Sequence, residues 1–80
     1  MKELSEMSLA HLADFIGQEW TNVYFGAVPY LSAMTQLDSV DDNFVNDSGR
    51  SVVTYFLANA QTWRGDSARA VKKELNRRIK

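Results

Sequence analysis

Cysteine is absent from this 80-residue chain, and histidine occurs only once, at His11. Without thiols, no disulfide bond supports the fold, and cysteine-based zinc sites and thiol catalysis are excluded. A single imidazole also excludes a histidine-rich metal centre. We therefore expect the fold to rest on a hydrophobic core alone, and the protein to need neither a cofactor nor a metal.

Long apolar runs are lacking as well. No uncharged apolar stretch approaches the roughly 20 residues of a membrane-spanning helix. The N-terminus begins Met-Lys-Glu without the apolar segment of a secretory signal. Hydrophobic residues nevertheless make up 45% of the chain, which is ordinary for a globular domain and argues against disorder. These features predict one domain over residues 1–80, a cytoplasmic location and no membrane association.

Helical periodicity recurs in four segments of the chain. In the first segment the apolar residues recur at spacings of three and four: Leu9, Leu12, Ile16 and Trp20. Ser8 precedes them and is a good N-cap. The only proline, Pro29, falls in the first turn of the second segment, where its missing N–H does no harm. The sequence therefore predicts an all-α fold, a bundle of about four short helices over residues 8–21, 27–37, 48–63 and 66–79.

The third segment has the strongest apolar pattern. Projected as a helix, one broad face carries Val52, Val53, Phe56, Leu57, Ala60 and Trp63. The run Val-Val-Thr-Tyr-Phe also suits a β-strand by propensity, but the spacing and the length of the segment favour a helix. Gly65 fits the position that ends this helix, and Asp66 fits the N-cap of the next one.

Positive charge is concentrated near the C-terminal end. The formal net charge is only −1, yet residues 64–80 hold seven of the nine Lys and Arg residues. Five of these cations fan across the side of the last predicted helix opposite its apolar stripe: Arg69, Lys72, Lys73, Arg77 and Lys80. This basic face could meet an acidic protein surface, track nucleic-acid phosphates, or be a solvated face that complements the helix dipole. We take these five residues as the candidate partner-binding site.

The register of the sequence disfavours a helix-turn-helix motif around this basic face. With Gly65 at the turn, Gln61 stands where a small residue is needed, and Asp66 and Glu74 occupy apolar positions. Glu74 instead forms a favourable i, i+4 pair with Arg78. The net charge of −1 also argues against a dedicated DNA-binding protein. Nucleic-acid binding is therefore the weaker alternative.

The sequence contains no recognisable constellation for catalysis or metal binding. The loop over residues 38–47 is rich in Asp and Asn, but it lacks the spacing and the distal Glu of a calcium loop. His11 lies one helical turn from Asp14, without a paired nucleophile motif or a glycine-rich phosphate loop. We therefore predict that the protein is not an enzyme and keep catalysis as a distant alternative.

Aromatic residues exceed what a small helical core can bury completely: Trp20, Tyr24, Phe25, Tyr30, Tyr55, Phe56 and Trp63. Either some of this aromatic surface stays exposed or is covered in a homodimer, or the core is dense and keeps the hydroxyl groups at its edge. Together with the polarised charge, this predicts a small non-catalytic protein–protein interaction protein of accessory or adaptor type. Its partner is another protein or a second copy, and a nucleic-acid-binding module using the last helix is the alternative.

Overall fold

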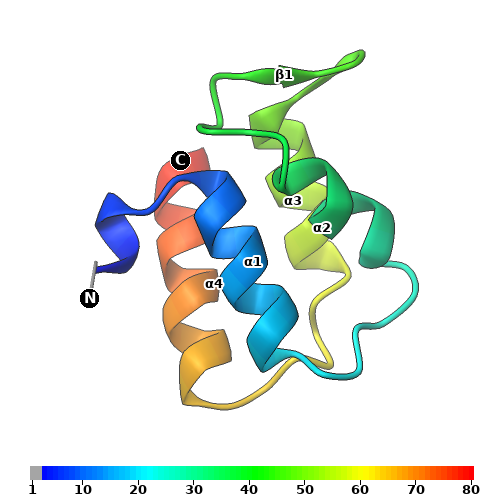
Figure 1. Cartoon of the computed structure of the whole chain (residues 1–80), viewed down its shortest axis with the longest axis vertical. Coiled ribbons are helices and arrows are strands. Elements are labelled where there is room, and N and C mark those ends of the chain that lie inside the picture. Colours follow the sequence, from blue (N-terminus) through cyan, green and yellow to red (C-terminus); the bar gives the residue numbers. More distant parts are fainter. Residues whose placement is uncertain (1–2) are drawn as a thin grey trace.

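Four α-helices make up most of the computed structural model, which describes residues 3–80 (Figure 1). α1 (Leu9–Glu19) packs against α2 (Val28–Met34) and α4 (Asp66–Ile79), and α3 (Gly49–Ala58) packs against the same two helices. The four helices therefore close into a ring, and the predicted all-α fold is confirmed. A short 3₁₀-helix, η1 (Leu4–Glu6), precedes α1.

A continuous hydrophobic core lies between these helices. Its largest fully buried side chains are Phe56, Leu9, Leu12, Ile16, Met34, Leu37, Leu75, Val53 and Val71. The rings of Trp20 and Trp63 stack with their centroids 5.7 Å apart, and the Trp20 ring meets Phe56 edge-on at 6.3 Å. The segments that follow α1 and α3 are thus held together by aromatic contacts within the core.

α1 begins as the sequence predicts. The hydroxyl oxygen of Ser8 accepts a hydrogen bond from the N–H of His11 at 3.1 Å, which caps the helix. The first two N–H groups of α1 donate to the carbonyl oxygens of Asp38 and Leu37, at 2.9 and 2.8 Å. The N-terminal end of α1 therefore gains hydrogen-bond acceptors from the segment that follows α2, as a buried helix end requires.

α2 is shorter than the predicted helix over residues 27–37. It begins at Val28, has Pro29 in its first turn and ends at Met34. The chain then turns, with the N–H of Leu37 donating to the carbonyl of Met34 at 3.1 Å. This turn brings the carbonyls of Leu37 and the next residue to the end of α1, which a continued helix could not do. Leu37 stays buried without being helical.

A small hairpin interrupts the predicted loop over residues 38–47. β1 (Asn43–Phe44) pairs antiparallel with β2 (Asp47–Ser48), and Phe44 is partly buried against the core. Val45 lies between the strands with φ 55°, in the left-handed region that β-branched residues rarely adopt. The periodicity of the sequence could not reveal this hairpin, because each strand has only two residues.

α3 is a helix, as predicted in preference to a strand, but its predicted end at residue 63 is wrong. The helix begins after Ser48, whose hydroxyl accepts from the N–H of Ser51 at 3.1 Å. It ends at Ala58, and the side-chain amide of Asn59 donates to the carbonyl of Tyr55 at 2.9 Å. Asn59 thereby satisfies a carbonyl of the last turn. The chain continues in turns that still bury the next apolar residues, Ala60 and Trp63.

α4 (Asp66–Ile79) confirms the predicted helix over residues 66–79, but its cap residue differs from the prediction. Gly65 has φ 113° and is the N-cap position of α4, so it does not end α3. Asp66 is the first residue of α4 rather than its cap. The positive φ favours glycine here because a side chain would be strained in this conformation. α4 then buries Ala68, Val71 and Leu75 along one stripe.

Candidate functional site

Four of the five predicted site residues lie on α4 and Lys80 is its C-cap, and the structure brings three of the five together. Lys73, Arg77 and Lys80 line an open depression of about 690 Å³ between α4 and Leu4 of η1, and Glu74 lines it too. Lys73 and Lys80 are exposed, and neither takes part in a hydrogen bond or ion pair among the described residues. The other cations of the set are occupied within the chain.

Lys72 is turned toward the core instead of the solvent. Its ammonium group donates to the carbonyl of Trp63 at 2.5 Å and lies 6.0 Å from the centroid of the Trp63 ring. Burial lowers the pKa of Lys72 below its ordinary value, and the nearby charge of Arg64 lowers it further. Because a cation beside an aromatic face is attracted to it, Lys72 contributes to the packing of Trp63. It is the least available of the five predicted residues.

Arg69 and Arg77 have carboxylate partners on the same helix. Arg69 pairs with Asp66, and both side chains are largely exposed. Arg77 donates two hydrogen bonds to Glu74, at 3.1 and 2.6 Å. The solvent-exposed pair of Arg69 with Asp66 contributes little stability. Glu74 is largely buried, but the side chains of Arg69 and Arg77 are themselves largely exposed, so both guanidinium groups can still reach an external partner. Their charge is nevertheless partly offset by the neighbouring carboxylates.

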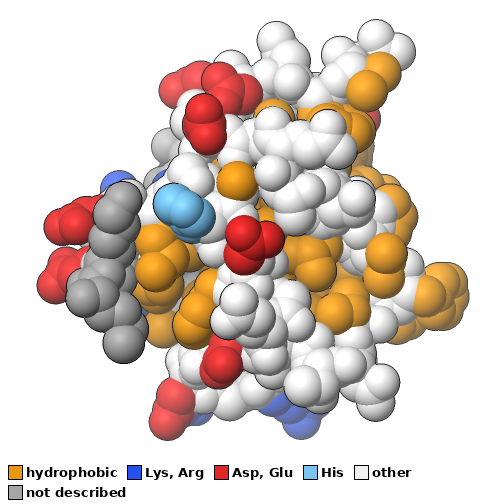
Figure 2. Space-filling view, viewed as in Figure 1, with side chains coloured by type: hydrophobic (Ala, Val, Ile, Leu, Met, Phe, Trp, Pro, Cys, Tyr) orange, Lys and Arg blue, Asp and Glu red, His pale blue; other side chains and the backbone are white. Residues whose placement is uncertain are grey.

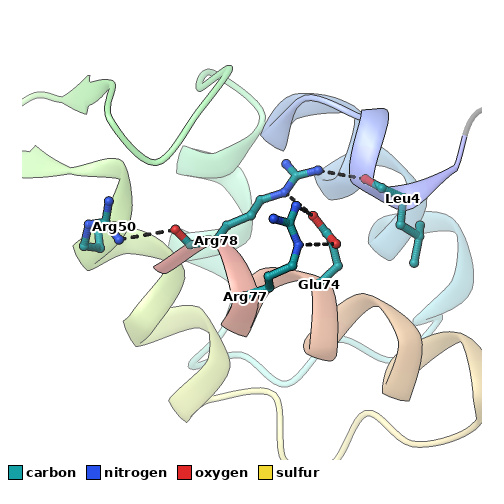
Figure 3. A network of polar contacts seen from close by, with 5 residues as sticks. All are labelled: Leu4, Arg50, Glu74, Arg77 and Arg78. Atoms are coloured by element: carbon teal, nitrogen blue, oxygen red, sulfur yellow. Dashed lines mark hydrogen bonds and ion pairs between the residues drawn. The ribbon is translucent and has the colours of Figure 1, made fainter. Parts of the chain in front are cut away.

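A polar network at the C-terminal end of α4 ties distant parts of the chain together (Figure 3). Arg78 donates to Glu74 at 2.6 Å, which confirms the predicted i, i+4 pair, and also to the carbonyl of Leu4 at 2.7 Å. Arg50 at the start of α3 donates to the carbonyl of Arg78 at 3.3 Å. The side chains of Arg78 and Glu74 are only 13% and 10% exposed. Arg78 therefore joins three elements and acts in the fold.

The other side of the molecule is built mainly from two stretches of the chain that contain no charged residue. Residues 20–37 and 51–63 contain no Asp, Glu, Lys, Arg or His. They form α2, most of α3 and the turns that precede α2 and follow α3. Figure 2 shows hydrophobic side chains gathered toward the right of the molecule, where Figure 1 places α2 and the segment before it. In the described part of the chain, the charged residues therefore belong to the N-terminal segment with η1, to α1, to residues 38–50 and to residues 64–80.

Large apolar side chains are exposed on this uncharged side. Phe25 is 79% exposed, Tyr55 51%, Val28 49% and Tyr24 42%. The rings of Tyr24 and Phe25 are 4.8 Å apart, and those of Tyr30 and Tyr55 are 5.5 Å apart. We call these five residues the aromatic face. The expectation that some aromatic surface stays exposed is confirmed.

Gly26 allows the Tyr24 ring to lie close to the end of α3. A Cβ atom at Gly26 would lie 2.6 Å from the Tyr24 ring and 2.9 Å from the side-chain oxygen of Asn59. Tyr24 therefore packs close to the end of α3, where Asn59 is hydrogen-bonded to Tyr55. Glycine is needed because any side chain would push these groups apart. The aromatic face thus runs from the segment before α2 to the last turn of α3.

An open hollow lies beside Phe25 on the same side. It has a volume of about 360 Å³ and is lined by Tyr24, Ala58, Asn59, Gln61 and Thr62. None of these residues is charged, and all but Asn59 are exposed. Since Tyr24 touches Phe25 and also lines the hollow, a protruding ring and a recess stand next to each other.

Sequence reasoning expected exposed aromatic surface but did not choose it as the candidate site, although the sequence carries its signal. It selected a cluster of positively charged residues. The signal of the aromatic face is different, because its two stretches of the chain contain no charged residue. The two uncharged stretches, residues 20–37 and 51–63, contain all seven of the aromatic residues singled out above. Only the fold shows that these stretches lie together, because α2 packs on α3.

The acidic loop uses one of its carboxylates to build its own turn. The Asp42 carboxylate accepts hydrogen bonds from the N–H groups of Asp38 and Ser39, at 3.0 and 3.1 Å. Within residues 3–80, no three His, Asp or Glu side chains gather in a way that could hold a metal ion. Asp42 therefore builds a turn of the kind that Asp commonly forms.

No protein-family model, curated protein or solved structure matches this chain. None of the helices in the described part of the chain is long and apolar enough to span a membrane. Arguments about function therefore rest on the surfaces of the molecule itself.

Proposed function

We propose that this chain is a non-catalytic protein–protein interaction protein that binds its partner through the aromatic face. The observation that carries the proposal is the exposure of Tyr24, Phe25, Val28 and Tyr55, which belong to two stretches of the chain without charged residues. The buried centres of protein interfaces are enriched in aromatic residues and depleted of charged ones. Contiguous apolar surface that faces water commonly marks an interaction site.

The energetics of exposure support this proposal. Each exposed apolar side chain forgoes the burial free energy of about 25 cal/mol per Å² of apolar surface. Phe25 contributes little to the stability of the chain alone, since 79% of its surface faces solvent. A partner that covers Phe25 and its neighbours recovers this free energy. Lys73 and Lys80 of the basic face are available for a second, electrostatic contact with an acidic partner.

A pull-down with two matched variants tests this proposal. The wild-type chain is immobilised and exposed to an extract of its native host, beside an aromatic-face variant (Phe25→Ser with Tyr55→Ser) and a basic-face variant (Lys73→Glu with Lys80→Glu). All four positions are exposed, so circular dichroism should show the same fold in all three proteins. We expect the basic-face variant to retain the proteins captured by wild type, and the aromatic-face variant to lose them.

Two outcomes would contradict the proposal. Binding that survives in the aromatic-face variant and disappears from the basic-face variant would place the interaction on α4. A wild-type chain that captures no protein and does not associate with itself would show that the aromatic face is not a binding surface.

Nucleic-acid binding through α4 is the second candidate, and one observation favours it. Lys73, Arg77 and Lys80 line the same depression and could contact successive phosphates. With about three phosphate contacts on duplex DNA, a plot of the logarithm of the binding constant against the logarithm of the salt concentration should have a slope of about −2.7. The pairing of Arg77 with Glu74 and the inward position of Lys72 weaken this candidate. Fluorescence anisotropy with a labelled duplex at low salt measures it directly.

A further inference from the structure

We infer that the occupant of the aromatic face is a second copy of this chain, related by a two-fold axis. In this arrangement Phe25 of each copy enters the hollow of the other copy, which is lined by Tyr24, Ala58, Asn59, Gln61 and Thr62. The inference rests on the proposed function, because it takes the aromatic face as the binding surface and adds the identity of the partner.

Charge is the first argument for a second copy. A two-fold axis places a surface against itself, so every charged group on that surface would meet or approach its own like charge. The aromatic face and the hollow contain no charged residue, because residues 20–37 and 51–63 have none. Two copies can therefore close over this surface without like-charge repulsion and without burying an unpaired charge. A strongly acidic or basic partner would find no counterpart here.

The exposed polar side chains of the two uncharged stretches are also complementary to themselves. The exposed polar residues of the two uncharged stretches are Thr21, Asn22, Ser32, Thr35, Gln36, Thr54, Gln61 and Thr62. Hydroxyl and carboxamide groups both donate and accept hydrogen bonds, whereas Lys and Arg only donate and carboxylates only accept. Hydroxyls and amides of one copy can therefore pair with the same groups of another copy, whereas side chains of one charge could not.

Shape is the third argument. Phe25 protrudes, with 79% of its surface exposed, and the hollow of about 360 Å³ lies next to it across Tyr24. A cavity of about 150 Å³ is large enough to hold benzene, so the hollow has room for a benzyl side chain. In a two-fold dimer, a protrusion beside a recess produces two identical insertions. The same surface therefore supplies both the ring that is inserted and the hollow that receives it.

Sedimentation equilibrium of the full chain tests the inference. We expect wild type to approach twice its monomer mass of 9.1 kDa as the concentration rises from micromolar to submillimolar. Phe25→Glu should raise the dissociation constant of the dimer by at least about 30-fold, the loss typical of a hot-spot residue. The matched control is Val45→Glu, because Val45 is 81% exposed but lies in the hairpin outside the uncharged stretches. This control should dimerise like wild type.

A mixing experiment separates reciprocal insertion from a general effect of added charge. Ala58→Lys places a cation in the hollow, at an exposed position at the end of α3. Alone, this variant should be monomeric, as should Phe25→Glu. Mixed together, the two variants should form a heterodimer, because one insertion site is then wild type and the other pairs a Glu with a Lys. If the ring of Phe25 does not enter the hollow of the other copy, mixing the two variants should not restore a dimer.

The results that overturn the inference differ from those that overturn the proposed function. A wild-type chain that remains a 9.1 kDa monomer at every concentration excludes the dimer, while the pull-down can still find a different partner on the aromatic face. A dimer that survives Phe25→Glu, or variants that fail to associate on mixing, would show that the two copies do not meet by reciprocal insertion.

Discussion

The two sides of this molecule are held by different kinds of contact. On the side of α1 and α4, polar contacts join distant segments: Ser67 donates to Glu19 at 3.0 Å, and Arg78 links Glu74 to the carbonyl of Leu4. On the side of α2 and α3, apolar and aromatic packing dominates, and Phe25 and Tyr55 remain exposed after the fold has formed. Charged residues thus form the long-range contacts of the first side, and they are absent from the segments that expose aromatic surface on the second side. Substitutions that remove the polar contacts of the first side should therefore change stability, and substitutions of the exposed aromatic residues on the second side should change association.

The largest effect is expected from the aromatic contact within the core. Trp63 is only 4% exposed, stacks on Trp20 and offers its carbonyl to Lys72. Trp63→Ala should lower the free energy of unfolding by about 3–5 kcal/mol, because it removes a large buried ring. Urea unfolding followed by circular dichroism measures this loss. A variant as stable as wild type would contradict the packing described for both sides.

Arg78 should show the next largest effect. Arg78→Met removes the hydrogen bonds to Glu74 and to the carbonyl of Leu4, both largely shielded from solvent. The expected loss in the free energy of unfolding is about 2–3 kcal/mol. The matched control is Arg69→Met, because Arg69 also pairs with a carboxylate on α4 but is largely exposed, and it should unfold like wild type. Equal losses of stability in the two variants would show that the largely buried Arg78 contributes no more to the fold than the exposed Arg69.

Acid should weaken the same network. The hydrogen bond from Arg77 is the main cause that lowers the pKa of the Glu74 carboxyl below its ordinary value of 4.5, and Arg78 lowers it further. Because the folded-state pKa is the lower one, ionised Glu74 contributes its full stabilisation above pH 4.5. This contribution is lost as the pH falls through the folded-state pKa.

Urea unfolding at a series of pH values checks this titration. In Glu74→Gln the part of the acid-dependent loss that belongs to Glu74 should be missing, so its stability should fall less steeply below pH 4.5 than that of wild type. Identical pH profiles for the two proteins would show that the network does not depend on the charge of Glu74.

The smallest effect is expected at the tip of the hairpin. Val45 is 81% exposed and has φ 55°, a conformation that glycine adopts without strain. Val45→Gly should therefore raise the free energy of unfolding by about 1 kcal/mol, since little apolar burial is lost. Thermal unfolding measures the gain. A lower stability would mean that Val45 contributes packing or restricts the unfolded chain by more than its strain costs.

The four helices could be predicted from the sequence because each has an apolar stripe with helical spacing. The ends of α2 and α3 could not, because Leu37 and Trp63 continue the apolar pattern while the backbone has already turned. The link between Arg78 and Leu4 joins residues 74 positions apart and depends on how η1 lies against α4. No periodicity encodes such a contact.

The candidate site was readable from the sequence only in part. The basic residues of α4 were found, but their pairing with Asp66, Glu74 and the Trp63 carbonyl depends on side-chain geometry. The excess of aromatic residues was recognised, yet which of them are exposed depends on packing that the sequence does not specify. Trp20 and Trp63 enter the core, whereas Phe25 does not.

The most direct test of this account follows backbone amides by NMR while the concentration of the full chain is raised. The account predicts that concentration-dependent shifts cluster in residues 20–37 and 51–63, with the largest changes near Phe25 and Ala58, and that residues 64–80 change little. In Phe25→Glu the shifts should disappear. Changes centred on α4, or spectra that do not vary with concentration, would contradict the claim that the uncharged aromatic face is where two copies of this chain meet.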